Sequence, residues 1–130
     1  MRIDAIDHVQ VTSPPDVEED MRFFYSTVLR LPELIKPEPL KNNKGAWYLL
    51  GNIQLHVSTE RDTKNYASRR HICFRVRDLF AFQNHLKAYD VAIILDRQPI
   101  ADYDHFYLRD PGGNRIEITA PKPLEETLIR

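Results

Sequence analysis

Short stretches of alternating apolar and polar residues recur along the chain, and this period of two is typical of half-buried β-strands. In residues 5–12, Val9 and Val11 share one face, and the opposite face carries His8, Gln10 and Thr12. Two further stretches, 45–50 and 53–57, flank a Gly-Asn turn and predict a hairpin. The polar face of its second arm is formed by Gln54, His56 and Ser58.

A helical pattern follows the first strand. Ser13 comes before two prolines and Asp16, so we expect a helix to start there with Ser13 as its cap. Apolar residues then recur at steps of four and three, at Val17, Met21, Phe24, Val28 and Leu31. This spacing predicts an amphipathic helix of about four turns that ends near Pro32. Residues 33–43 contain two more prolines and predict an irregular or edge strand with a loop.

The remainder of the chain shows the same succession of patterns. Residues 70–76 alternate as a strand, and Asp78 is expected to cap a helix with apolar positions at Leu79, Phe82, Leu86 and Tyr89. A strand at 91–95 and a loop at 96–104 precede a last hairpin, whose turn is the Asp-Pro-Gly-Gly-Asn sequence 110–114. Ile116 and Ile118 share the packed face of its return strand, so Glu117 stands on the opposite face.

An internal repeat connects the two halves. His71 lies 63 positions after His8, and Glu117 lies 63 positions after Gln54. We therefore predict an α+β fold of two tandem βαβββ modules that pair into a curled mixed sheet, with the helices outside. The expected boundaries are 3–58 for the first module, 59–69 for the linker, 70–120 for the second module and 121–130 for a tail. The uncovered sheet faces are suited to lining a cup.

Composition narrows the classes of function. The chain has 130 residues, enough for one domain, and its 18 Lys and Arg nearly balance its 19 Asp and Glu. This balance argues against nucleic acid or an anionic membrane as a partner and favours a small-molecule substrate. With one cysteine and no apolar signal or membrane segment, we expect a cytoplasmic protein without disulfides.

Four residues on the uncovered faces form a candidate metal site: His8, Gln54, His71 and Glu117. Two imidazoles, a carboxylate and an amide oxygen suit a divalent ion such as Mn, Fe, Co, Ni or Zn. The two histidines and the carboxylate alone would also serve non-haem Fe(II). Each residue taken singly is explained as an ordinary polar strand residue. All four at one offset favour the metal site.

At these residues the chain resembles the vicinal oxygen chelate superfamily, which includes glyoxalase I, methylmalonyl-CoA epimerase, extradiol dioxygenases and the fosfomycin and bleomycin resistance proteins. The resemblance covers about residues 3–120 and is carried by the segments Ile6-Asp-His-Val9, 21–31, 70–74 and 108–117. It implies paired βαβββ units and a metal bound at the positions of His8, His71 and Glu117. A fourth ligand would stand at Gln54, as in the epimerases.

The first functional hypothesis is a metal-dependent lyase or isomerase. The family chemistry implies that a metal accepts two adjacent substrate oxygens, stabilises an enediolate or enolate, and so acidifies a neighbouring C–H group. The substrate would be a small α-oxo compound or an acyl thioester. Glu117 is the candidate base, with Glu38 as a weaker second candidate, because Gln54 has no titratable group.

A second hypothesis is an extradiol-type dioxygenase. His56 and Tyr107 are similar in placement to the acid-base histidine and the tyrosine of those enzymes, with His8, His71 and Glu117 as the iron or manganese triad. The chain is shorter than most extradiol enzymes, which counts against this reading. Either residue also has an ordinary interpretation, as a cavity wall or a hydrogen-bonding group.

A third hypothesis is a binding or resistance protein without chemistry, although such relatives lack the metal residues. In any of the three cases Arg109, His105 and Arg75 are candidate substrate contacts, and salt bridges are an equally good interpretation of the arginines. Cys73 falls on the cavity face, but nothing indicates an activated thiol. The family resemblance also implies a homodimer, with the cup formed within one chain or between two.

Overall fold

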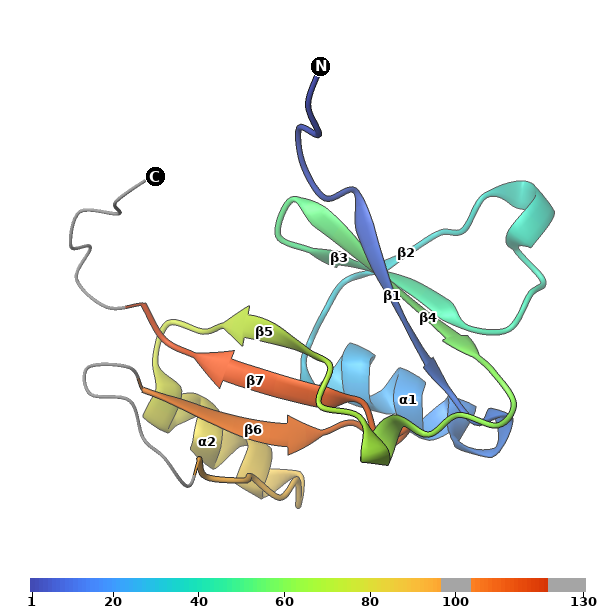
Figure 1. Ribbon diagram of the computed structural model, residues 1–130. Helices are drawn as coiled ribbons and strands as arrows, with labels where there is room; N and C mark the ends of the chain where they lie inside the picture. The colour runs from blue at the N-terminus through green and yellow to red at the C-terminus, as the bar shows by residue number, and fades with distance from the viewer. Residues whose placement is uncertain (97–103, 122–130) are drawn as a thin grey trace. The chain divides into compact units, whose positions relative to one another are not determined.

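The computed structural model describes residues 1–96 and 104–121 and has the predicted α+β architecture (Figure 1). The chain divides into two compact units, one of residues 1–70 with 109–114, the other of 71–108 with 115–130. The turn of the last hairpin thus belongs to the first unit. The predicted module boundaries at 58 and 70 concern the sequence repeat and stay a prediction.

The first unit is built on a four-stranded sheet in the order β1-β4-β3-β2. Its strands are β1 (His8–Ser13), β2 (Glu33–Leu34), β3 (Ala46–Leu50) and β4 (Ile53–Thr59). β1 runs parallel to β4, and β3 pairs antiparallel with both β4 and β2. The predicted hairpin is confirmed, with Gly51 at positive φ in its two-residue turn.

The predicted first helix is present but irregular. It consists of a 3-10 turn (Pro15–Val17), the helix α1 (Glu18–Phe23) and a π-helical turn (Phe24–Val28). The prediction that Ser13 caps it is wrong, because Ser13 is the buried last residue of β1 and its Oγ donates to the carbonyl of Pro14 at 3.2 Å. The chain leaves the helix through Arg30, at φ 57°, before Pro32.

Apolar residues of this helix and of the sheet form the core of the first unit. The buried members are Met21, Phe24, Tyr25, Val28, Ala46, Tyr48, Leu55 and Val57. Each large side chain contributes about 1.5–3 kcal/mol by leaving water. The strand alternation therefore assigned the packed face correctly.

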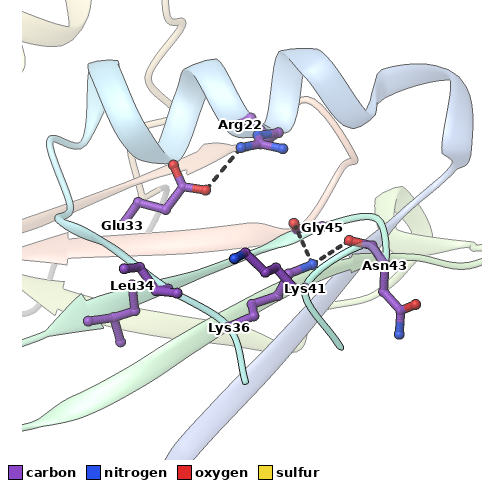
Figure 2. A pocket seen from close by; sticks show the side chains of 8 residues that line it. Arg22, Glu33, Leu34, Lys36, Lys41, Asn43 and Gly45 are labelled. Atoms are coloured by element: carbon purple, nitrogen blue, oxygen red, sulfur yellow. Dashed lines mark hydrogen bonds and ion pairs between the residues drawn. The ribbon is translucent and has the colours of Figure 1, made fainter. Parts of the chain in front are cut away.

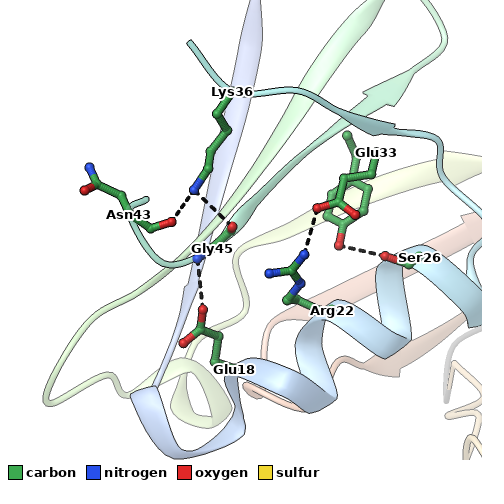
Figure 3. Close-up of polar contacts among 8 residues, drawn as sticks. Glu18, Arg22, Ser26, Glu33, Lys36, Asn43 and Gly45 are labelled. Carbon is green, nitrogen blue, oxygen red and sulfur yellow. Dashed lines mark hydrogen bonds and ion pairs between the residues drawn. The ribbon is translucent and has the colours of Figure 1, made fainter. Parts of the chain in front are cut away.

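The segment between β2 and β3 is irregular, as predicted, with a 3-10 turn at Glu38–Leu40. Lys36 Nζ closes it by donating to the carbonyls of Asn43 and Gly45 (Figure 2). The amide of Gly45 donates to Glu18 Oε1 at 3.0 Å, and Arg22 of α1 pairs with Glu33 at 3.0 Å (Figure 3). These contacts border an open pocket of about 360 Å³. Its cationic side chains each contact an oxygen of the first unit: Arg22 contacts Glu33, Lys36 contacts the carbonyl of Asn43, and Lys41 contacts Glu38.

The second unit has a three-stranded sheet in the order β5-β7-β6, with β5 parallel to β7. Its elements are β5 (His71–Arg75), α2 (Leu79–Ala88), β6 (His105–Arg109) and β7 (Arg115–Thr119). Asp78 caps α2 as predicted, since its Oδ1 accepts from the amide of Ala81 at 3.0 Å. The sheet's packed side chains are Phe106, Leu108, Ile116 and Ile118.

The strand predicted at 91–95 is wrong in extent. Within the described residues only Ile94 is paired there, through an isolated antiparallel bridge to Tyr107 of β6. Ile94 pairs with the outer strand β6, as β2 pairs with β3 in the first unit. The repeat therefore includes a fourth strand position in each unit. The segment follows Asp90 at positive φ and both Ile94 and Leu95 are largely exposed, so little burial favours a longer strand. Most of the predicted loop 96–104 lies outside the described residues, as does most of the predicted tail.

The ladder register of the two units differs by two residues. His8 lies opposite Gln54, but His71 lies opposite Arg115 and Cys73 opposite Glu117. The expectation that Gln54 and Glu117 occupy equivalent places is therefore wrong at the level of the ladder. Because side chains alternate with period two, a shift of two keeps Glu117 on the predicted face.

Candidate metal site

A buried carboxylate, Asp110, organises the turn that precedes β7. Asp110 is 1% exposed and accepts hydrogen bonds from Tyr25 Oη at 2.7 Å, Gly112 N at 3.0 Å, and both nitrogens of Asn114 at 2.9 Å. Burial raises the pKa of Asp110, although these donors act to lower it. Burial followed by the charge of Asp110 also raises the pKa of Tyr25 well above its usual range.

Arg109 reinforces the same turn. Its Nη1 donates to the carbonyls of Asn65, Ser68 and Gly113 at 3.0–3.1 Å. This nitrogen is thus committed to holding the backbone of the linker and the turn. The expected contact of Arg109 with substrate stays a prediction, as does that of Arg75, which is exposed on β5. Sequence reasoning identified the turn but missed this structural role, because the acceptors are backbone atoms and two of the three are distant in sequence.

Glu117 and His71 meet on the polar face of the second sheet. Nε2 of His71 lies 3.0 Å from Oε1 of Glu117, whose residue is 6% exposed, while the His71 ring remains accessible. Two ligand atoms that bind one metal ion at about 2.1 Å and at right angles lie about 3.0 Å apart. The separation is that of a hydrogen bond, and it is also compatible with two neighbouring ligands of one octahedral metal ion.

A third side chain, His105, approaches the same carboxylate. Its Nε2 is 2.8 Å from Asp96 Oδ2, and its Nδ1 is 3.7 Å from Glu117 Oε2. The His105 side chain is only 3% exposed, so it lies buried beside the carboxylate rather than lining an open surface. Sequence analysis placed His105 among the substrate contacts and missed Asp96, which lies in a segment without periodicity.

Tyr107 borders the pair on β6. Its ring makes edge contacts with His71 and His105, at centroid distances of 5.7 and 5.4 Å, and Arg115 lies 3.9 Å above its face. Burial, and then the charge of Glu117, raise the pKa of the Tyr107 phenol. The phenol is therefore a hydrogen-bond donor at neutral pH rather than a phenolate.

The other two predicted ligands, His8 and Gln54, both contact His56 in the first unit. His56 lies between His8, at a centroid distance of 4.2 Å and 13° between planes, and Trp47, at 3.8 Å and 3°. Its Nε2 is 2.9 Å from Gln54 Oε1. Burial, followed by the proximity of His8, lowers the pKa of His56.

The four predicted ligands thus form two pairs, His8 with Gln54 in the first unit and His71 with Glu117 in the second. Among the residues that the structure describes, no group of three or more His, Cys, Asp or Glu side chains has the arrangement of a metal cluster. Each pair has a donor set that a divalent ion accepts.

Comparison with known proteins identifies the family. Residues 5–118 match the family described as the glyoxalase/bleomycin resistance protein/dioxygenase superfamily. The chain belongs to this superfamily. None of the curated proteins matches the chain.

Solved structures share the fold. A glyoxalase family protein from Bacillus anthracis is 37% identical, covers 94% of this chain and 100% of its own, and superposes with a TM-score of 0.82. A genomically encoded fosfomycin resistance protein, FosX, from Listeria monocytogenes is 14% identical over 93% of this chain and 94% of its own, with a TM-score of 0.76. A lactoylglutathione lyase from Agrobacterium tumefaciens is 19% identical over 92% and 96%, with a TM-score of 0.68.

The helices of the chain were also compared with those that cross a membrane. No helix in the described part of the chain has the length and apolar character that a bilayer crossing requires. Superfamily members typically bind small molecules.

Proposed function

We propose that this protein is a metal-dependent lyase or isomerase that acts on a small α-oxo or acyl-thioester substrate. The observation that carries the proposal is the 3.0 Å approach of His71 Nε2 to Glu117 Oε1 on the face opposite the core. His71 and Glu117, together with His8 and Gln54, would hold a divalent ion. When bound, such an ion supplies electrophilic stabilisation of an enolate or enediolate.

The chain's own residues suit the proton transfer that this chemistry needs. Glu117 is the group we assign to accept the proton from substrate carbon, because it is the buried carboxylate on this face of the second unit. The His105 ring lies beside its second oxygen, with Nδ1 3.7 Å from Oε2, and Asp96 in turn holds that ring through Nε2 at 2.8 Å. Tyr107, as a neutral phenol, can donate a hydrogen bond to a substrate oxygen.

Both donor pairs are needed for the full ligand set, and they can come from one chain or from two. We propose that the protein acts as a homodimer, on the ground of the family resemblance. Light scattering of the purified protein checks the dimer, and a monomer that retains metal and activity would contradict it.

Elemental analysis of protein purified without chelators or a histidine tag tests the metal. We expect about one Zn, Ni, Co or Mn per chain, and loss of both metal and turnover in Glu117→Gln. Turnover is followed as deuterium incorporation at the carbon next to the carbonyl of α-oxo acids and acyl thioesters in D₂O. Full metal occupancy in Glu117→Gln would contradict its role as a ligand.

A second candidate function, extradiol-type ring cleavage, is favoured by one observation, the neutral Tyr107 beside His71. Tyr107 resembles the tyrosine of extradiol dioxygenases in its placement, and two histidines with one carboxylate suit non-haem Fe(II). Oxygen uptake with catechols after anaerobic loading with Fe(II) tests this alternative. Absence of metal at any loading would instead favour a binding or resistance protein.

A further inference from the structure

The ring stack of the first unit extends across three neighbouring strands. His56 on β4 lies directly opposite Trp47 on β3 and next to His8 of β1, and only 7% of it is exposed. Rings stacked on both faces of the imidazole restrict its rotation. The two neighbours therefore fix the plane of the His56 imidazole.

This fixed plane excludes one role for His56. The lone pair of an imidazole nitrogen lies in the plane of the ring, and His8 and His56 are nearly parallel at 4.2 Å. Their lone pairs therefore point along two separate planes and do not converge on one ion. His56 lies opposite Gln10 in the first sheet, as Glu117 lies opposite Cys73 in the second. His56 therefore has the ladder position of a proposed metal ligand, and the ring planes are what exclude it from that role.

The hydrogen bond of His56 assigns it another role. An amide oxygen accepts only, so Nε2 of His56 donates the hydrogen to Gln54 Oε1 at 2.9 Å. The amide oxygen has a second lone pair for a metal ion, whereas the amide nitrogen cannot serve as a ligand. Rotating the Gln54 amide by half a turn would place its NH₂ group against the His56 N–H.

We propose that His56 is a positioning residue that fixes the Gln54 amide with Oε1 presented as a metal ligand. The proposal rests on the proposed metal-binding function and adds to it a residue outside the ligand set. Groups that orient a ligand in this way typically change metal affinity 10–100-fold, roughly, when removed. The stack of His8 and Trp47 on His56 fixes the orientation of the His56 N–H group. That N–H group in turn fixes the orientation of the Gln54 amide.

Two substitutions separate the hydrogen bond from the stack. His56→Phe keeps a flat ring between His8 and Trp47 but removes the donor, and His56→Gln restores an N–H donor without the ring. Metal-free protein is titrated with Co²⁺, followed by cobalt absorption and by the emission of Trp47, the one tryptophan of the chain. We expect about 10–100-fold weaker Co²⁺ binding in His56→Phe and partial recovery in His56→Gln.

A control in the other unit distinguishes this inference from the proposed function. If His71→Ala loses Co²⁺ binding while His56→Phe binds as wild type does, the positioning role is wrong and the metal site stands. If neither variant changes binding, both are wrong.

Nitrogen-15 NMR of the metal-free wild-type protein provides a test that needs no variant to fold. We expect the neutral His56 ring with its proton on Nε2. A proton on Nδ1 instead would overturn the proposal.

Discussion

Nε2 of His71 lies 3.0 Å from Oε1 of Glu117, although the two residues are not opposite each other in the ladder. The contact is diagonal across the parallel pair β5 and β7, and the long side chain of Glu117 spans it. The His71 side chain is partly accessible, whereas the Glu117 carboxylate is buried. This relationship makes His71 the proposed ligand whose removal is easiest to interpret.

His71→Ala should leave the fold intact, because about one third of the side chain is exposed. We expect the affinity for Zn²⁺ or Co²⁺ to fall by at least about 100-fold, since one ligand is lost outright. Isothermal titration of metal-free protein measures the change. Phe80→Ala, on the exposed surface of α2, is the matched control and should bind as wild type does.

Asp110→Ala should lower the free energy of unfolding by about 3 kcal/mol, because it leaves several buried donors without their acceptor. Tyr25→Phe removes only one of those donors and should cost about 1 kcal/mol. Urea denaturation followed by circular dichroism compares the two. Equal losses would show that the carboxylate does not organise the turn.

The raised pKa of Asp110 has a consequence for acid stability that is opposite to the usual one for a carboxyl group. Between its ordinary value of 3.8 and the higher value in the fold, the folded protein binds the proton more tightly than the unfolded chain does. The contribution of Asp110 to the free energy of unfolding therefore falls as pH rises through this window and is largest below 3.8. Urea titrations of the wild type and Asp110→Asn should show a difference that shrinks in this direction; a difference that grows with pH would contradict it.

Tyr107 should remain protonated beyond the ordinary phenol value of 10.0, because burial and the charge of Glu117 raise its pKa. The difference in absorbance near 295 nm between wild type and Tyr107→Phe, followed against pH, measures this group alone. In Glu117→Gln we expect its midpoint to move down toward 10.0, since one of the causes is removed. An unchanged midpoint would show that the charge of Glu117 has no effect on Tyr107.

Two glycines with positive φ provide a matched pair for the hairpin of β3 and β4. A Cβ on Gly45 would meet the carbonyl oxygen of Val57 at 2.2 Å, whereas one on Gly51 meets nothing within 4 Å. Gly51→Ala should therefore cost about 1 kcal/mol from backbone strain alone. Gly45→Ala should cost at least about 3 kcal/mol and weaken the bond of Gly45 to Glu18. Thermal unfolding compares them, and similar midpoints would contradict the close approach.

Much of this fold follows from local pattern. The period of two assigned Leu55, Val57, Ile116 and Ile118 to packed faces. Within the strand that follows the Asp-Pro-Gly-Gly-Asn turn, the same period placed Glu117 on the face opposite Ile116 and Ile118. The cap at Asp78 was predictable because it depends on residues within one turn of helix. The cap at Ser13 was not, because burial of the β1 end and the proline geometry overrode its local preference.

The sequence by itself determined which residues share a polar face, because alternation within a strand is a local property and tolerates any even shift of register. Only the tertiary structure decided how those residues pair. It placed Glu117 diagonally to His71, bound Gln54 to His56, and brought His105, paired with Asp96, beside the Glu117 carboxylate. Register and long-range contacts depend on packing between strands that are distant in sequence, and no local pattern encodes that packing.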